Sequence, residues 1–129
     1  MGRLDKKVAI VTGAGCVGPG WGNGRAIATR FIEEGASVFA VDLASEQLEE
    51  TLAYNAAHKD RIIPYTCDVT KLDQIEAMIG ACIAQFGTID ILVNNVGGSQ
   101  KGGPVELSAQ DWQRQIDYNL TSVFSACKF

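Results

Sequence analysis

The stretch of sequence that decides the fold is glycine-rich: Thr12-Gly13-Ala14-Gly15-Cys16-Val17-Gly18-Pro19-Gly20-Trp21-Gly22-Asn23-Gly24. It follows a short apolar run at residues 8–11 and leads into a helix-like run at residues 25–32. A strand, a glycine loop and a helix in this order can receive a phosphate group. The loop backbone can approach an anion closely, and the unpaired N–H groups at the helix start point at it. The sequence therefore predicts an anion-binding turn between the first strand and the first helix.

A second apolar run, residues 37–41, ends in Asp42, about eighteen residues beyond Gly24. A carboxylate at the end of the second strand of such a unit can accept hydrogen bonds from both ribose hydroxyls of an adenosine. The glycine turn and Asp42 together indicate a dinucleotide site. The alternative is that Asp42 is only a turn residue at the end of a strand.

Length and charge exclude several classes of protein. The chain has 129 residues, of which 47% are hydrophobic, so it can form the core of one domain. Its net charge of −4 argues against a nucleic-acid partner, because phosphate backbones favour basic surfaces. The first residues run directly into a short strand, and no apolar run has the length of a membrane span. We therefore expect a cytoplasmic protein with no membrane and no nucleic-acid partner.

The four cysteines, Cys16, Cys67, Cys82 and Cys127, are scattered, and none is in C-x-x-C spacing. This pattern favours small buried thiols over disulfides or metal ligands. The single histidine, His58, lies at an expected helix end among small and charged residues. No metal site is expected.

Strand and helix patterns alternate along the whole chain. Strands are predicted at residues 8–11, 37–42, 62–66 and 89–93, and helices at 25–32, 45–57, 72–86 and from 109 to about 127. The order βαβαβαβα predicts the α/β class, with a parallel sheet covered on both faces by helices and right-handed crossovers. Residues 1–129 are expected to form one domain without an internal linker.

Short signals mark the expected helix ends. Ser45, Thr70 and Ser108 are predicted N-caps, the last two within capping-box spacings. Gly35 and Gly87 are predicted helix stops. In the third strand Pro64 predicts an edge position or an irregular start, because proline cannot donate to a ladder.

The glycine segment resembles the first fingerprint of the short-chain dehydrogenase/reductase family, a Thr-Gly turn followed by Gly-x-Gly at the helix start. The two parts are Thr12-Gly13-Ala14-Gly15 and Gly22-Asn23-Gly24-Arg25. The segment between them, residues 16–21, is longer than the family pattern. A literal G-x-G-x-x-G also exists at Gly13, Gly15 and Gly18, but we interpret it as chance because the helix is expected only after Gly24. Trp21, within the enlarged loop, is open to two interpretations: covering a pyrophosphate or packing on the surface.

Three further fingerprints follow in the family's order. Cys67-Asp68-Val69 resembles the segment whose Asp reaches the adenine amino group, and Asn94-Asn95-Val96-Gly97 resembles the family's Asn-Asn-Ala-Gly. Asn119 matches the helix asparagine that holds a proton-relay water near the active site. The resemblance thus implies Asn119 as a catalytic-site residue and a set of cofactor-binding residues: Thr12, Gly13, Gly15, Gly22, Asn23, Gly24, Asp42, Asp68, Val69, Asn95, Val96 and Gly97.

The resemblance also implies a Rossmann-type doubly wound parallel sheet. In the family's strand order, 3-2-1-4-5-6-7, this chain would supply 3-2-1-4, an incomplete sheet with its fourth strand at an edge. The family's catalytic Tyr-x-x-x-Lys is not found in the sequence. Four residues after Tyr54, Tyr65 and Tyr118 come His58, Val69 and Ser122. We therefore expect the chain to be the N-terminal part of a longer single domain, inactive and poorly soluble by itself.

The leading functional hypothesis is an oxidoreductase that transfers a hydride between NAD(H) and a carbonyl or secondary alcohol substrate, active in the full-length protein. Asp42 favours NAD over NADP, since a carboxylate repels a 2′-phosphate. The last expected helix carries a long apolar stripe, and the resemblance implies that this helix helps form a subunit interface, so a homo-oligomer is expected. One alternative is an enoyl-thioester reductase, which the enlarged loop with Gly20-Trp21-Gly22 resembles although Asn94, Asn95 and Asn119 argue against it. The other is a non-catalytic nucleotide-binding fragment.

Overall fold

A computed structural model describes residues 2–17 and 19–129 of the chain. Gly18, the third glycine of the literal G-x-G-x-x-G, lies outside the described residues. The elements, in chain order, are β1 (Val8–Thr12), α1 (Asn23–Glu33), β2 (Ser37–Asp42), α2 (Ser45–Tyr54), η1 (Ala56–His58), β3 (Ile62–Thr66), α3 (Leu72–Phe86), β4 (Ile91–Val93), α4 (Ala109–Ile116), the π-helical η2 (Asp117–Thr121) and α5 (Ser122–Lys128).

The strands form one parallel sheet in the order β3-β2-β1-β4, which confirms the predicted Rossmann-type order 3-2-1-4. All five residues of β1 are buried, as expected of a central strand covered on both faces. Ile10 pairs with Phe39 of β2 and with Leu92 of β4. β3 is an edge strand, so Pro64 has the edge position that the sequence predicted.

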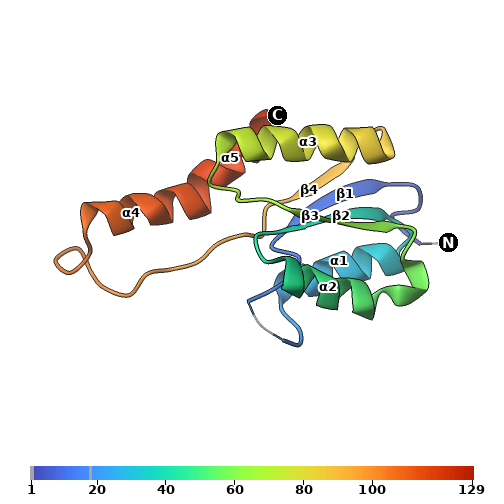
Figure 1. Ribbon diagram of the computed structural model, residues 1–129, viewed down its shortest axis with the longest axis horizontal. Coiled ribbons are helices and arrows are strands. Elements are labelled where there is room, and N and C mark those ends of the chain that lie inside the picture. The colour runs from blue at the N-terminus through green and yellow to red at the C-terminus, as the bar shows by residue number, and fades with distance from the viewer. Residues whose placement is uncertain (1, 18) are drawn as a thin grey trace.

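Helices cover both faces of this sheet (Figure 1). α1 and α2 lie on one face, whereas α3 and α5 lie on the other. Each face has its own core, because alternate strand residues point to opposite sides. Val38 packs with Ala28, Ile32 and Leu48 of the first helix pair. On the other face lie Ile10, Phe39, Ile75, Met78 and Cys82. Full burial of an aliphatic side chain such as Ile32 contributes about 2 kcal/mol, so the two cores hold the layers together.

The glycine stops predicted for two helices are confirmed. Gly35 (φ 97°) follows α1 and Gly87 (φ 84°) follows α3, both in the left-handed region that glycine enters without strain. The predicted start of α1 after Gly24 is wrong by two residues. Gly22 is the N-cap and the helix begins at Asn23, so both of these residues belong to the helix start.

Two of the three predicted N-caps are wrong. α2 begins after Ala44 rather than being capped by Ser45, and α3 has Lys71 at its N-cap instead of Thr70. The Thr70 hydroxyl is engaged elsewhere, because it donates to the Asp68 carboxylate at 2.6 Å. Ser108 is confirmed as the cap of α4, since its hydroxyl oxygen accepts from the Asp111 N–H at 3.0 Å. The same kind of hydroxyl side chain therefore caps a helix in one loop, as Ser108 does, and binds a neighbouring carboxylate in another, as Thr70 does.

Two element boundaries also differ from the prediction. α2 ends at Tyr54, and residues 56–58 form a separate short 3₁₀ turn. β4 begins at Ile91 rather than at residue 89. The Asp90 carboxylate accepts from the Val8 N–H at 2.9 Å, so a side chain replaces a backbone carbonyl at the start of this strand pair.

The last helix is interrupted where the sequence predicted a continuous one. The π-helical turn η2 separates α4 from α5, and α4 extends away from the sheet as an arm (Figure 1). α5 buries its small residues Ser122, Ser125 and Ala126. The apolar stripe points outward: Leu120 is 62% exposed and Phe124 is 63% exposed. Among the described helices, none combines the length and apolarity needed to cross a bilayer.

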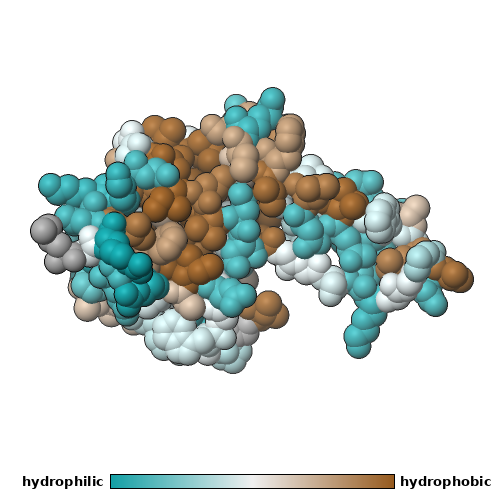
Figure 2. All heavy atoms as spheres, turned by 180° about the vertical axis from the view of Figure 1, so that it is seen from behind, coloured by the Kyte–Doolittle hydropathy of each residue, from teal (hydrophilic) through white to brown (hydrophobic). Residues whose placement is uncertain are grey.

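The exposed edge and stripe lead to a prediction for the 129-residue chain by itself. β4 has a free edge in the described sheet, and a broad apolar patch covers part of the surface opposite to the view of Figure 1 (Figure 2). Unpaired strand edges and large apolar patches promote association. We expect the isolated chain to form mixed oligomers in sedimentation velocity. A monodisperse monomer with a cooperative thermal transition would contradict this prediction.

Candidate functional site

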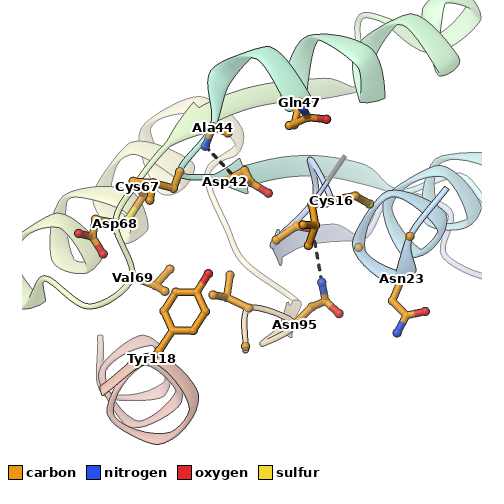
Figure 3. Close-up of a pocket in the computed structure, with 17 residues that line it drawn as sticks. Cys16, Asn23, Asp42, Ala44, Gln47, Cys67, Asp68, Val69, Asn95 and Tyr118 are labelled. Carbon is orange, nitrogen blue, oxygen red and sulfur yellow. Dashed lines mark hydrogen bonds between the residues drawn. The ribbon is translucent and has the colours of Figure 1, made fainter. Parts of the chain in front are cut away.

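A cavity of about 550 Å³ lies at the carboxyl ends of the strands. This is where open parallel α/β sheets bind ligands, at the point where the strand order reverses. Figure 3 shows side chains from the turn after β1, the end of β2, the loop after β3 and the loop after β4 around this space. The residues that line it are Gly13, Cys16, Val17, Gly22, Asn23, Gly24, Asp42, Leu43, Ala44, Gln47, Cys67, Asp68, Val69, Asn95, Val96, Gly97 and Tyr118.

Most of the predicted site residues line this cavity, although they come from four separate parts of the sequence. They are Gly13, Gly22, Asn23, Gly24, Asp42, Asp68, Val69, Asn95, Val96 and Gly97. Three predicted residues do not line it: Thr12, Gly15 and Asn119. Each of these three residues instead holds in place a segment that lines the cavity.

Thr12 is a buried connector behind the cavity, with 2% of its surface exposed. Its hydroxyl donates to the Val93 carbonyl at 3.2 Å and accepts from the N–H groups of Asn95 at 3.0 Å and Val96 at 3.3 Å. It therefore fixes the loop after β4 against the end of β1. This loop carries the Asn-Asn-Val-Gly segment into the cavity wall.

Asp42 is held in a fixed orientation by two backbone donors. The Gly15 N–H donates to Oδ2 at 2.9 Å. The Ala44 N–H donates to Oδ1 at 3.1 Å, the bond drawn at Asp42 in Figure 3. Each carboxylate oxygen has two lone pairs, so one remains on each oxygen for a ligand. The half-buried carboxylate thus offers a pair of acceptors to the cavity from the end of β2.

The start of α1 lies close against the turn after β1. A Cβ on Gly24 would overlap the carbonyl oxygen of Gly13, and Gly13 itself has a φ of 67°. Gly22, in extended conformation at the N-cap of α1, makes no side-chain cap, and in the first turn the Arg25 N–H donates to Cys16 Sγ at 3.3 Å. The first N–H groups of a helix lack partners within the helix and carry its positive dipole end. This corner of the cavity has the chemistry of an anion site.

The opposite wall contains Asp68, Val69 and Cys67. The hydroxyl and N–H of Thr70 donate to the Asp68 carboxylate and lower the pKa of that group, so it is charged at neutral pH. Burial raises the pKa of the Cys67 thiol to about 11, which keeps it neutral. This wall therefore combines one acceptor with apolar surface. The described residues contain no cluster of three His, Cys, Asp or Glu side chains that could hold a metal ion.

The two predicted amides have different positions. Asn95 lines the cavity and donates through Nδ2 to the Gly13 carbonyl at 3.4 Å (Figure 3). Asn119 lies in η2, where its Nδ2 donates to the carbonyls of Gly98 and Gln115, each at 2.9 Å. Its Oδ1 accepts from the Gly98 N–H at 3.0 Å. Asn119 thus ties the loop after β4 to the π turn.

Sequence reasoning missed several lining residues. The ring of Tyr118 comes from η2 and lies near Val69 on one side of the cavity (Figure 3). Gln47, in the first turns of α2, lies beyond Asp42, and its Oε1 is buried without a hydrogen-bond partner among the described atoms. Neither residue belongs to a recognisable motif. The π turn that directs Tyr118 has no local signature in the sequence.

The enlarged loop is divided between the cavity and the surface. Cys16 and Val17 line the cavity. Trp21 packs on Tyr54 of α2, with ring centroids 4.6 Å apart, and is not a lining residue. Of the two interpretations of Trp21, surface packing is therefore the one observed. A second, smaller cavity of about 190 Å³ lies between the loop after β4 and α4, and Tyr118 borders both.

Comparison with known proteins identifies the class to which this fold and site belong. A sequence model of the short chain dehydrogenase family matches residues 7–129. This chain belongs to the short-chain dehydrogenase/reductase family. Its resemblance to a crystal structure described as a short-chain dehydrogenase/reductase from Burkholderia xenovorans has a TM-score of 0.95 at 50% identity, covering 100% of this chain and 51% of that one.

Two relatives of known activity are similar over nearly the whole chain. A D-threitol dehydrogenase of Mycolicibacterium smegmatis is 39% identical over 126 residues, covering 98% of this chain and 46% of the relative. A 3-oxoacyl-[acyl-carrier-protein] reductase of Thermotoga maritima is 34% identical over 123 residues, covering 95% of this chain and 48% of the relative. The chain thus spans about half the length of the relatives that it matches.

Proposed function

We propose that this chain carries the dinucleotide-binding part of an NAD-dependent oxidoreductase that transfers a hydride between NAD(H) and a carbonyl or secondary alcohol. The observation that carries the proposal is the Asp42 carboxylate. It is fixed at the end of β2 by the N–H groups of Gly15 and Ala44 and faces the cavity beside the start of α1. Family membership supports a nicotinamide cofactor.

The residues around the cavity fit such a cofactor. Asp42 would bind the adenosine ribose, and Asp68 and Val69 would contact the adenine. The pyrophosphate would lie at the start of α1, where Gly22, Asn23 and Gly24 line the cavity and Gly24 leaves no room for a Cβ. Asn95, Val96 and Gly97 would lie beside the remaining half of the dinucleotide. The bound nicotinamide supplies or accepts the hydride, and this chain's residues hold and orient it.

The charge of the cavity wall supports NAD over NADP. A 2′-phosphate on the adenosine ribose would meet the carboxylate of Asp42. No lysine or arginine is found among the described residues that line the cavity. Like charges in close contact disfavour binding unless a cation compensates.

The remaining features of the whole protein are proposed with the same function. Residues 1–129 would form part of one larger Rossmann-type domain, and catalysis would require the whole protein. Asn119 would support the catalytic site through the loop after β4. The exposed stripe with Leu120 and Phe124 would form a homo-oligomer contact. The substrate is a small alcohol or carbonyl compound, in line with the names of the two relatives, and the protein would be cytoplasmic.

Two alternative functions, an enoyl-thioester reductase and a non-catalytic nucleotide-binding role, each have a specific observation in their favour. The enlarged loop after β1 favours an enoyl-thioester reductase, whereas Asn94, Asn95 and Asn119 favour the alcohol and ketone branch. The absence of Tyr-x-x-x-Lys from the printed sequence favours a nucleotide-binding role for this chain by itself.

Calorimetric titration of the full-length protein with NAD, NADP and NADH tests the proposal. We expect one site per chain and tighter binding of NAD than of NADP, together with dehydrogenation of a secondary alcohol in a screen of polyols and hydroxyacyl thioesters. Reduction of an enoyl thioester with no turnover of alcohols would favour the first alternative. Binding of NAD without turnover of any substrate would favour the second, and absence of NAD binding would overturn the proposal.

A further inference from the structure

Arg25 is the third residue of α1, and its side chain is completely buried, with 0% of its surface exposed. A buried charge is costly unless it is paired and hydrogen-bonded throughout. The guanidinium meets this requirement with partners from the glycine loop and from α2. They are Thr51 Oγ1 at 2.8 Å, the carbonyls of Gly15 at 2.6 Å, Gln47 at 2.9 Å and Gly20, and the carboxylate of Glu50 at 3.5 Å.

These contacts close the enlarged loop at both ends. Arg25 binds the carbonyl of Gly15 at its beginning and the carbonyl of Gly20 near its end. Glu50 accepts from the N–H of Gly20 at 3.0 Å, so both polar groups of this residue are held. A longer loop loses more conformational entropy when it is ordered, and fixed anchor points reduce that cost at the time of ligand binding.

Arg25 and Thr51 also act on the Asp42 carboxylate, through the peptide units Ala14–Gly15 and Gly15–Cys16. Thr51, which accepts from Arg25, donates through its hydroxyl to the Ala14 carbonyl at 2.7 Å. The N–H of that same peptide unit belongs to Gly15 and donates to Asp42 Oδ2 at 2.9 Å. The next peptide unit is held by its carbonyl, which accepts from Arg25. A rotation of the first unit would turn the Gly15 N–H away from Asp42, and Arg25 opposes it through Thr51 and through the neighbouring Gly15 carbonyl.

We propose that Arg25, acting with Thr51, is a positioning residue for the adenosine half of the dinucleotide. It fixes the peptide that orients the Asp42 carboxylate, and it does so without touching the ligand. The guanidinium does not line the cavity, and its donors are used by backbone carbonyls, Thr51 and Glu50. This inference rests on the proposed function, since it assigns Asp42 to the ribose.

The test uses Arg25→Lys in the full-length protein. Lysine keeps the charge but cannot bind several carbonyls in a fixed plane. We expect the KM for NAD and the Ki of AMP as a competitive inhibitor to rise together by about tenfold, because preorganisation is lost. We expect kcat to change less than about twofold, because the reacting end of the cofactor is not affected.

A matched control is Arg61→Lys. Arg61 also binds backbone carbonyls, those of Ile32 at 2.9 Å and Ala36 at 2.7 Å, but at the end of α1 away from the cavity. We expect Arg61→Lys to lower the melting temperature and leave the KM for NAD unchanged. The two variants are compared at conditions where they have lost the same stability. If Arg25→Lys then raised the KM for NAD no more than Arg61→Lys does, the inference would be overturned.

A second pair of variants applies if Arg25→Lys does not fold. Thr51→Val removes the hydroxyl at nearly constant shape and is expected to reproduce the rise in the KM for NAD, while Thr51→Ser retains the hydroxyl and is expected to restore wild-type values. Equal values for the two variants would overturn the inference. Wild-type protein that binds no NAD would overturn the proposed function itself, whereas wild-type binding with unchanged variants overturns only the role of Arg25.

Discussion

Replacing Asp42 by alanine is expected to weaken NAD binding by the full-length protein about a hundredfold and to abolish its preference for NAD over NADP. The physical reason is the loss of two charge-assisted hydrogen bonds to the ribose, each worth about 1.5–3 kcal/mol. The same change removes the carboxylate that would repel a 2′-phosphate. NADP binding should therefore weaken less than NAD binding, or improve.

Steady-state kinetics with both cofactors measures this effect as the ratio of kcat/KM values. Asp60→Ala is the matched control, because Asp60 is an exposed carboxylate that does not line the cavity and the change in net charge is identical. Asp42→Asn separates charge from hydrogen bonding, since it keeps an acceptor oxygen and removes the repulsion. An unchanged preference in Asp42→Ala would refute the assignment of Asp42 to the ribose.

Replacing Gly24 by alanine is expected to destabilise the protein by about 3 kcal/mol and to abolish NAD binding. The added Cβ would overlap the carbonyl oxygen of Gly13 and come within 2.7 Å of the Asn95 Nδ2. Both neighbours belong to the cavity wall, so α1 would have to move away from the turn after β1. The displaced N–H groups would no longer face the place proposed for the pyrophosphate.

Gly80→Ala is the control for this substitution. Gly80 lies within α3, and a Cβ there would meet nothing within 4 Å. Alanine should stabilise that helix by about 0.5–1 kcal/mol, because glycine is the poorer helix former. Thermal unfolding and NAD titration compare the two variants. Normal NAD affinity in Gly24→Ala would show that the close approach of α1 to the turn is not needed for binding.

The fold could be predicted from sequence to a large extent, because its signals are local. The helical spacing of apolar residues in 72–86 and the glycine stop at Gly87 define α3 within a single stretch of chain. The strand bounds of β3 and the edge position of Pro64 were also predicted correctly. The caps Ser45 and Thr70 were wrong, because a small hydroxyl side chain has several possible partners and only the folded loop selects one.

The family and most of the lining of the cavity were determined by the sequence alone, since glycines and strand-end carboxylates carry their geometry in short motifs. Tertiary structure decided the rest. Nothing in the sequence distinguishes the buried Arg25 from an ordinary exposed arginine on a helix, because its partners Thr51 and Glu50 lie on another helix. The π turn that brings Tyr118 to the cavity likewise holds Asn119, whose side chain is bonded to the loop after β4 far away in the sequence. Contacts between distant segments set these positions, so no local pattern could reveal them.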